Sequence, residues 1–213
     1  MSSATPAERA YLEAIERNYY SPTPGSRWSD IDSFVRFLVE YGMARVMPAP
    51  GRRERALADS ISSIRPYLSK LEDFDLLDVD LSQTTVGGER IRDLVARVYQ
   101  SINTGMRTRQ VRENATLVGK VMHILHPRLF VIWDDKIRQP RGFGRSFDEY
   151  WRYLETAQTG LREILEHYRS ISRDPHASSG PIESSLYEKG CKPITKLYDE
   201  ACSAMVRGWL HFF

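Results

Sequence analysis

The residues with the clearest potential for chemistry lie in one stretch, LVGKVMHILHPRLFVIWDDKIR, which covers residues 117–138. It holds a lysine, two histidines and two adjacent aspartates. A lysine amine becomes a nucleophile when burial or a second cation lowers its pKa, and a carboxylate can stabilise a developing positive charge. We therefore take Lys120, His123 and Asp134 as candidate catalytic residues.

The elements that would position these side chains can be predicted from the sequence. A helix is expected over about 114–126, where Thr116, Lys120 and His123 follow one another at steps of four and three residues and so share a face. Proline at position 127 ends this helix, and the five apolar residues LFVIW (129–133) should form a buried extended segment, the best strand candidate of the chain. Asp134 then stands at the start of another helix, where backbone amides and the helix dipole orient a carboxylate.

Each of these residues also has an ordinary structural interpretation. An aspartate that begins a helix is more often a cap than a catalyst, and Asp135 would then be a common first-turn acid. Lys120 could be a solvated lysine. His123 and His126 could be hydrogen-bonded residues near a helix end. The sequence leaves these alternatives open, and only the combination favours a catalytic site.

The composition of the chain predicts a folded, soluble protein. The chain has 213 residues, of which 41% are hydrophobic and 11% aromatic, enough for one substantial domain or two small lobes. No apolar run approaches the ~20 residues that span a bilayer, and MSSATPAERAYLE lacks the apolar core of a signal peptide, so a cytoplasmic protein is expected. Cys191 and Cys202 form no CxxC pair, and no metal site or disulfide is predicted.

Helical periodicity dominates the rest of the chain, and the fold is predicted to be all-α. Residues 74–88 (FDLLDVDLSQTTVGG) form an acidic, irregular link that separates an N-terminal helical lobe, 1–73, from a second lobe, 89–213, the two packing together as one unit. Pro66 should kink or divide a helix in the first lobe. Asn103 and Gly105 suit a left-handed helix stop in the second. Further helices are expected over about 7–19, 30–41, 52–72, 89–103, 147–169 and 193–209.

The central stretch resembles the core of the helix-hairpin-helix DNA glycosylase superfamily. That superfamily has a Gly-Lys element and a later aspartate segment of the type Val-Asp-Thr-His-Val. The matching residues here are Gly119, Lys120 and Val121, followed by residues 132–137 with Asp134 three positions before Ile137. The resemblance covers about thirty residues. It implies a two-lobed helical fold, Asp134 as the catalytic aspartate and Lys120 as the nucleophile of the bifunctional members.

The chain departs from that pattern in two places. The hairpin normally has the sequence Leu-Pro-Gly-Val-Gly, whose glycine amides meet a DNA phosphate, whereas this chain has one glycine in LVGKV. No cysteine cluster for an iron–sulfur centre follows, and no cofactor is expected.

Double-stranded DNA with a modified base is the expected partner. The formal charge is +2, from 30 Lys and Arg against 28 Asp and Glu, which excludes a histone-like binder but permits a local basic face. Seven cations bracket the candidate site and could contact phosphates: Arg107, Arg109, Arg112, Lys136, Arg138, Arg141 and Arg145. Residues that could line a pocket for an extruded base are Trp133, Asp135, His126, Phe143, Tyr150 and Trp151.

The sequence thus predicts a monomeric DNA N-glycosylase that excises a damaged or modified base after base flipping. Its target could be a hypermodified base of phage DNA, in which case the enzyme would serve antiviral defence. The sequence leaves open whether water or Lys120 attacks the sugar, and whether abasic sites are cleaved. The alternative is a non-catalytic nucleic-acid-binding or toxin–antitoxin type module with the same fold. A nucleotide or small-molecule hydrolase is disfavoured because no metal-ligand spacing and no phosphate loop is present.

Overall fold

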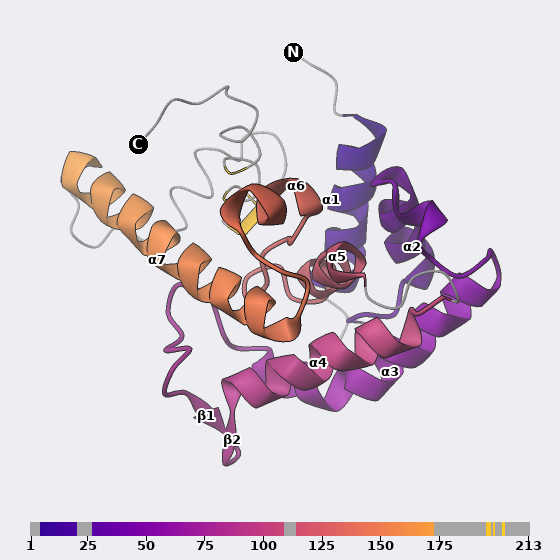
Figure 1. Cartoon of the computed structure of the whole chain (residues 1–213), viewed down its shortest axis with the longest axis horizontal. Coiled ribbons are helices and arrows are strands. Elements are labelled where there is room, and N and C mark those ends of the chain that lie inside the picture. Colours follow the sequence, from indigo (N-terminus) through magenta and orange to yellow (C-terminus); the bar gives the residue numbers. More distant parts are fainter. Residues whose placement is uncertain are drawn as a thin grey trace.

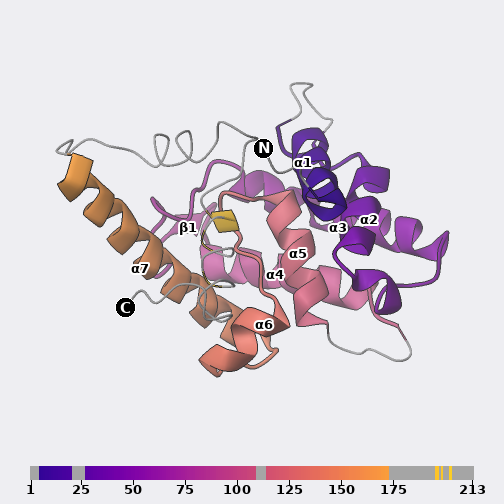
Figure 2. The ribbon, with the colours of Figure 1, turned by 90° about the horizontal axis from the view of Figure 1, so that it is seen from above.

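The helices of the chain pack around a central helix, α5, as Figure 1 and the turned view in Figure 2 both show. A computed structural model describes residues 5–20, 27–108, 114–172, 195, 196, 198 and 202. Its elements in chain order are α1 (Pro6–Asn18), α2 (Ile31–Glu40), η1 (Met43–Arg45), α3 (Arg52–Leu71), β1 (Thr85–Val86), β2 (Glu89–Arg90), α4 (Ile91–Gly105), α5 (Ala115–Leu125), α6 (Asp135–Arg138), η2 (Gln139–Arg141) and α7 (Phe147–Ser172). The strands of this described part are a single two-residue hairpin, so the all-α prediction is confirmed.

Local capping explains where several helices begin. Thr5 and Glu8 form a reciprocal capping box at the start of α1. Asp30 accepts a hydrogen bond from the backbone N–H of Ser33 at the start of α2. Asn114 accepts one from Leu117 at the start of α5, over 3.0 Å. These side chains satisfy backbone donors that a helix cannot satisfy itself, which is why such local signals were readable in the sequence.

Helix α5 is buried along its whole length. It contacts α1, α2 and α4, and in Figure 1 it lies between α1 and α2 on one side and α7 on the other. Because no face of α5 is left to solvent, its polar residues Thr116, Lys120 and His123 must find partners inside the protein. That requirement creates the polar cluster described below.

The structure differs from the sequence predictions in one detail of α3 and one of α4. Pro66 lies inside α3 and does not divide it, since the helix continues from Arg52 to Leu71. Gly105 is the last residue of α4 and does not adopt a left-handed conformation, and neither does the capping residue Met106, whose φ is −94°. A Cβ at Gly105 would lie 2.0 Å from the Ser60 hydroxyl oxygen, so this glycine permits the close approach of α4 to α3.

The segment 74–88, predicted to link the two lobes, packs into the molecule. Leu76, Leu77, Val79 and Leu81 are buried in the same hydrophobic core as residues from both sides of the segment. The side-chain amide of Gln158 in α7 donates to the carbonyl oxygen of Val79 over 2.7 Å. Contacts between α3 and α4 join the two predicted lobes directly.

The apolar segment 129–133 begins in a turn at Leu129, continues without helix or strand assignment to Trp133, and pairs with no strand among the described residues. Side chains satisfy its buried carbonyl groups instead. His123 bonds the carbonyl oxygen of Phe130, and the hydroxyl group of Tyr150 in α7 donates to that of Val131 over 3.4 Å. An isolated buried strand would leave these groups unpaired, so α5 and α7 supply what a sheet would otherwise provide.

The helix predicted over 193–209 lies mostly outside the described residues. Thr195, Lys196, Tyr198 and Cys202 are described, and all four are helical. Within the described ranges, the helices are all too short or too polar to cross a membrane.

Candidate functional site

Lys120 and Asp134 meet at the end of the extended segment. The ammonium nitrogen of Lys120 lies 3.4 Å from Oδ2 of Asp134. The lysine side chain is only 4% exposed, whereas the aspartate side chain is 28% exposed. The pair therefore has a buried cationic end and a carboxylate that faces solvent, so an approaching molecule would meet the carboxylate first.

Asp134 is held by the start of α6, as the sequence predicts. Its Oδ1 accepts a hydrogen bond from the backbone N–H of Lys136 over 2.9 Å, while Oδ2 faces Lys120. The two oxygens therefore have separate partners, which fixes the orientation of the carboxylate. Asp134 is thus both the N-cap of α6 and the ion-pair partner of Lys120.

Gly119 allows this meeting. A Cβ at position 119 would lie 3.0 Å from both Cβ and the backbone nitrogen of Trp133, the residue before Asp134. Only a glycine lets the extended segment approach α5 so closely. Gly119 lies inside α5 and not at its start, so it does not stand where the hairpin glycines of the glycosylase superfamily would present amides to a phosphate.

Tyr41, at the C-terminal end of α2, also contacts Lys120. Its carbonyl oxygen accepts a hydrogen bond from the lysine ammonium over 3.4 Å, and its ring centroid lies 5.3 Å from the same nitrogen. A second lysine, Lys196, places its ammonium nitrogen 5.9 Å from the centroid of the same ring and 5.6 Å from that of Tyr11. Neither Tyr41 nor Lys196 was predicted from the sequence, because no local motif marks either residue.

His123 is buried behind this cluster and does not reach its opening. Its Nδ1 lies 2.6 Å from the carbonyl oxygen of Phe130, and its Nε2 lies 2.8 Å from the hydroxyl oxygen of Tyr11. A carbonyl group only accepts, so Nδ1 carries the proton and Nε2 accepts from Tyr11. Burial lowers the pKa of His123 to about 3, and the charge of Lys196 acts in the same direction. His123 is thus a neutral core residue, which corrects its assignment as a catalytic contact.

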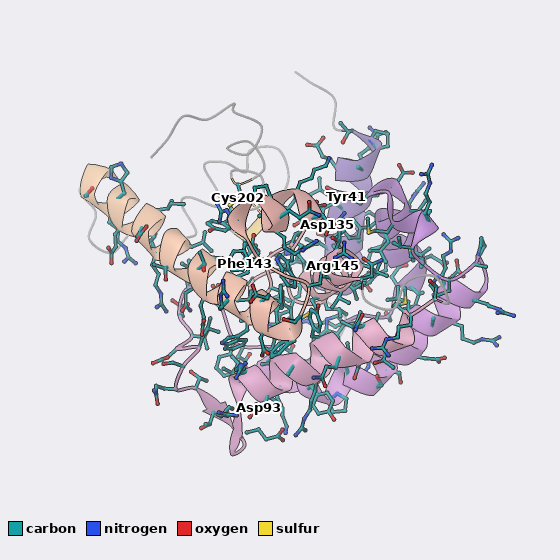
Figure 3. The ribbon with its side chains drawn as sticks, viewed as in Figure 1. Tyr41, Asp93, Asp135, Phe143, Arg145 and Cys202 are labelled. Carbon is teal, nitrogen blue, oxygen red and sulfur yellow. The ribbon has the colours of Figure 1, made fainter. Side chains whose placement is uncertain are left out.

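Asp135 lies at the surface beside the pair, close to Arg145 in Figure 3. Its Oδ1 accepts hydrogen bonds from Thr116 over 2.9 Å and from Arg138 over 2.6 Å. Burial alone would raise the pKa of Asp135, but these hydrogen bonds and the nearby arginine charges lower it overall. Asp135 therefore ties α5 to α6 as an ionised carboxylate.

The predicted pocket residues are mostly core residues. Trp133 is fully buried and packs against Tyr150 and Tyr153, while its indole N–H has no hydrogen-bond partner. Trp151 is 5% exposed and donates to Glu155. Neither aromatic ring is open to a flipped base in this conformation, because Tyr150 and Tyr153 of α7 cover Trp133 and because Trp151, itself in α7, is almost fully buried.

His126 and Phe143 also differ from their predicted roles. His126 donates to the carbonyl oxygen of Leu71 over 2.9 Å and joins α5 to the end of α3, and burial lowers its pKa to about 4. Phe143 packs edge-on against Tyr153 with its face toward Arg152. None of these interactions joins either residue to Lys120 or Asp134.

The predicted phosphate-binding cations divide into three groups. Arg107, Lys136 and Arg145 are exposed, with Arg145 3.9 Å from Asp135. Arg138 is buried and donates to the carbonyl oxygens of Phe143 and Gly144, and Arg141 donates to the Tyr198 hydroxyl group and the Cys202 sulfur. Arg109 and Arg112 lie outside the described residues. Arg138 thus has a structural position and not the exposed one expected for a phosphate contact.

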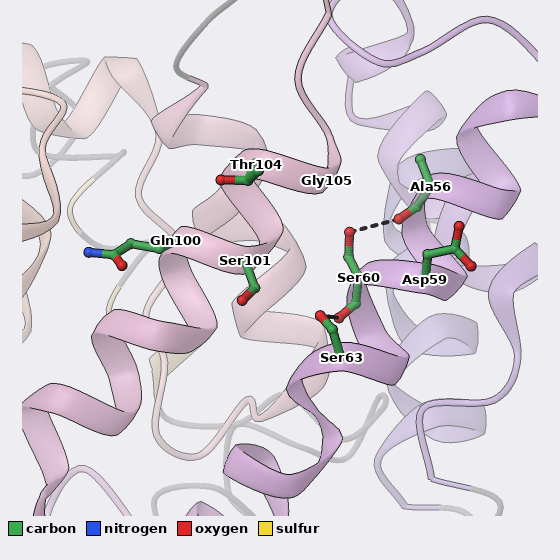
Figure 4. A pocket seen from close by; sticks show the side chains of 8 residues that line it. All are labelled: Ala56, Asp59, Ser60, Ser63, Gln100, Ser101, Thr104 and Gly105. Carbon is green, nitrogen blue, oxygen red and sulfur yellow. Dashed lines mark hydrogen bonds between the residues drawn. The ribbon is translucent and has the colours of Figure 1, made fainter.

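A separate open groove of about 560 Å³ lies between α3 and α4 (Figure 4). The hydroxyl groups of Ser60 and Ser63 both donate to backbone carbonyl oxygens of α3, over 2.7 Å in each case. No base activates either serine, so the groove offers no nucleophile. Its lining residues are Ala56, Asp59, Ser60, Ser63, Gln100, Ser101, Thr104 and Gly105.

Comparison of the chain with protein-family models, with curated proteins and with solved structures finds no match. Across the described residues, no group of three or more His, Cys, Asp or Glu side chains could hold a metal ion.

Proposed function

We propose that the chain is a DNA N-glycosylase whose reaction centre is the Lys120–Asp134 pair. The observation that carries this proposal is the 3.4 Å contact between a buried ammonium group and a carboxylate that is partly open to solvent. Lysine is almost never buried without a partner, and a buried ionisable group paired with a partly exposed one is typical of functional sites. The resemblance to the glycosylase superfamily rests on these same two residues.

The carboxylate of Asp134 has the position that such a reaction requires. When the bond between a base and C1′ of deoxyribose breaks, the sugar acquires positive charge, which a fixed carboxylate stabilises. The backbone of α6 orients Asp134 before the substrate arrives, so little reorganisation would be needed. The nucleophile that completes the reaction is either water or the amine of Lys120.

Three exposed cations near this opening or on the preceding loop, Arg107, Lys136 and Arg145, are suited to the phosphates of a duplex. Lys136 and Arg145 flank Asp134 in sequence, and Arg145 lies beside Asp135. Contacts of this kind give binding that is independent of sequence and sensitive to salt. A modified base, such as a hypermodified base of phage DNA, would provide the selectivity that phosphate contacts lack.

A second function has one observation in its favour. Asp134 caps α6 and neutralises a buried lysine, two roles that would retain it in a protein without catalytic activity. A non-catalytic nucleic-acid-binding module is therefore the alternative. It would bind DNA and release no base.

One experiment separates the two. The purified protein is incubated with genomic DNAs that carry damaged, methylated or glucosylated bases, and free bases are measured by mass spectrometry. We expect release of a base by the native protein and none by Asp134→Asn. If no base is released from any of these DNAs at high protein concentration while duplex DNA is still bound, the binding module is the correct function.

A further inference from the structure

The groove between α3 and α4 is built from residues that take no part in the ion pair described above. Near one end of the groove, Gly105, the last residue of α4, packs against Ser60 of α3. Beyond the other end, the guanidinium carbon of Arg97 in α4 lies 5.3 Å from the ring centroid of Tyr67 in α3. The two helices are therefore antiparallel, as Figure 1 also shows, and the end of α4 lies near the start of α3.

Three exposed arginines, Arg52, Arg55 and Arg107, lie at that end of the groove. Arg52 and Arg55 precede Asp59 by seven and four residues, spacings that place all three on one face of α3. Because Asp59 lines the groove, the two arginines continue the same wall to the N-terminal end of α3. Arg107 follows the last residue of α4, where the opposite wall ends. We call these three residues the entrance arginines.

The side chains of the entrance arginines form no ion pair or hydrogen bond with any described residue. Arg36 of α2, by contrast, is also exposed but is paired with Glu13 over 3.0 Å. Arg52 and Arg55 occupy the first and fourth positions of α3, where the helix dipole disfavours positive charge. Their charges therefore do not stabilise the helix, and they remain available to an anion from outside the protein.

The walls of the groove offer hydroxyl and amide groups. The side chains of Gln100, Ser101 and Thr104 on α4 have no hydrogen-bond partner among the described residues (Figure 4). Arginine, serine, threonine and glutamine are side chains through which proteins contact the phosphates and sugars of nucleic acids. The described lining contains no aromatic or large apolar side chain, so it lacks a surface for base stacking and the usual anchors of a protein–protein interface. The chemistry of the groove fits a sugar–phosphate backbone better than a base or a protein.

We propose that this groove and the entrance arginines bind the sugar–phosphate backbone of DNA, as a contact surface separate from the Lys120–Asp134 pair. The inference rests on the proposed function and extends it to residues outside the reaction centre. The phosphates lie at the arginines, and the sugars lie along the hydroxyl groups of the groove. Such contacts do not depend on sequence, so they retain DNA on the protein whether or not it carries a target base.

Asp59 opposes this ligand and provides a sensitive test. It is exposed, lines the groove and forms no ion pair with a described residue. Its negative charge repels a phosphate, whereas it would attract a cationic ligand. Asp59→Asn should therefore strengthen DNA binding by about two- to threefold. An unchanged or weaker affinity of this variant for DNA contradicts the proposal.

The main test uses a fluorescein-labelled DNA duplex of ordinary bases and measures fluorescence anisotropy over a range of salt concentrations. The groove variant, Arg52→Gln/Arg55→Gln, should bind at least about tenfold more weakly, and the slope of log affinity against log salt should flatten by about two units. Arg36→Gln/Arg90→Gln is the matched control, because it removes two charges from exposed arginines that are paired elsewhere on the surface. Its affinity should change less than about twofold.

Thermal unfolding shows whether the groove variant keeps its fold. It should be at least as stable as the native protein, because it removes charges that disfavour the start of α3. Two outcomes of the binding assay overturn the proposal. One is equal affinity of the groove variant and the native protein. The other is an equal loss in both double variants, which would mean that only net charge matters.

Poly-glutamate and vesicles that contain phosphatidylserine are tested in the same way. If the groove variant loses affinity for either of them and not for DNA, the groove binds an acidic protein or a membrane surface, and the proposal is overturned. We expect the native protein to bind DNA more tightly than both probes, because their anionic groups lack the regular spacing of backbone phosphates.

Base release separates the outcome for this inference from the outcome for the proposed function. If the native protein releases a base and the groove variant binds DNA as tightly as the native protein, the groove is refuted and the glycosylase remains. If the native protein releases no base from modified DNA while the groove variant binds DNA more weakly than the control, the groove is supported and the glycosylase is refuted.

Discussion

The ammonium group of Lys120 lies 3.4 Å from Oδ2 of Asp134, and the other oxygen of that carboxylate caps α6. One residue therefore ends an extended segment, begins a helix and neutralises a buried lysine. The capping role and the proposed catalytic role need different properties of the side chain: a cap needs an oxygen acceptor, and stabilisation of a cation needs a negative charge. Substitutions can separate them.

Asp134→Asn should reduce the rate of base release at least about a hundredfold while the fold is kept. The asparagine oxygen can still accept from the Lys136 N–H, so the cap is preserved and only the charge is lost. We expect the free energy of unfolding to fall by about 1–2 kcal/mol, since Lys120 loses a charged hydrogen-bond acceptor. Asp134→Ala should cost about 1 kcal/mol more because the cap is also lost. Denaturant titrations and mass spectrometry of released bases check both variants; a fully active Asp134→Asn protein would contradict the role.

Gly119→Ala should disturb the Lys120–Asp134 pair indirectly, through Trp133. The new Cβ would press on the Cβ and backbone nitrogen of Trp133 at 3.0 Å, which should cost about 1–3 kcal/mol of stability and displace Asp134 from Lys120. Gly144→Ala is a matched control, because its Cβ would approach only the flexible side chain of Glu149, at 3.2 Å. Thermal unfolding and base release should both fall in the first variant and change little in the second. Equal effects of the two substitutions would refute the role of Gly119.

The stability of the protein should decrease as the pH falls from about 6.5 toward 4. In the unfolded chain a histidine titrates near its ordinary value, whereas burial lowers the pKa of His123 to about 3 and that of His126 to about 4. The unfolded state then binds more protons than the folded state across this range. For each histidine, the free energy of unfolding therefore falls by on the order of 1 kcal/mol for every unit by which the pH decreases. Above pH 6.5 both states are neutral at these positions and the effect disappears.

In His123→Gln, unfolding between pH 6 and 4 should take up about one proton fewer than in the native protein. The slope of the unfolding free energy against pH, from denaturant titrations at several pH values, measures this number. The absolute stability should also fall, since the Phe130 carbonyl and the Tyr11 hydroxyl groups lose their shared partner. His167→Gln, on the exposed side of α7, is the control. A slope that is the same in both variants would contradict the assignment of His123 as a neutral buried residue.

The features predicted correctly from the sequence are those with local causes. The start of α5 at Asn114 and the cap at Asp134 depend on hydrogen bonds between neighbours in the chain. The helical spacing of apolar residues in α2 reflects the burial of one face of that helix. The features that were missed depend on distant partners. His123 is bonded to Tyr11, 112 residues away, so its spacing from Lys120 alone suggested a catalytic face.

The same reasoning explains the remaining differences. The segment 129–133 has the composition of a strand, but whether it joins a sheet depends on partners, and tyrosines of α7 and His123 provide them here. Lys120 and Lys196 both lie near the ring of Tyr41, a contact between three parts of the chain that no motif records.

DNA binding should separate the exposed cations from the buried ones. Lys136→Ala and Arg145→Ala should each flatten the dependence of duplex affinity on salt by about one unit of log–log slope, because each removes one phosphate contact, and stability should change little. Arg138→Ala should do the reverse: its guanidinium group holds Asp135 and the carbonyl oxygens of Phe143 and Gly144, so its loss should lower the unfolding free energy by about 2–4 kcal/mol through unpaired buried groups. Fluorescence anisotropy over a range of salt concentrations, combined with denaturant titration, checks each variant. Duplex affinity that does not change with salt would refute the phosphate contacts, and with them both the glycosylase and the nucleic-acid-binding module.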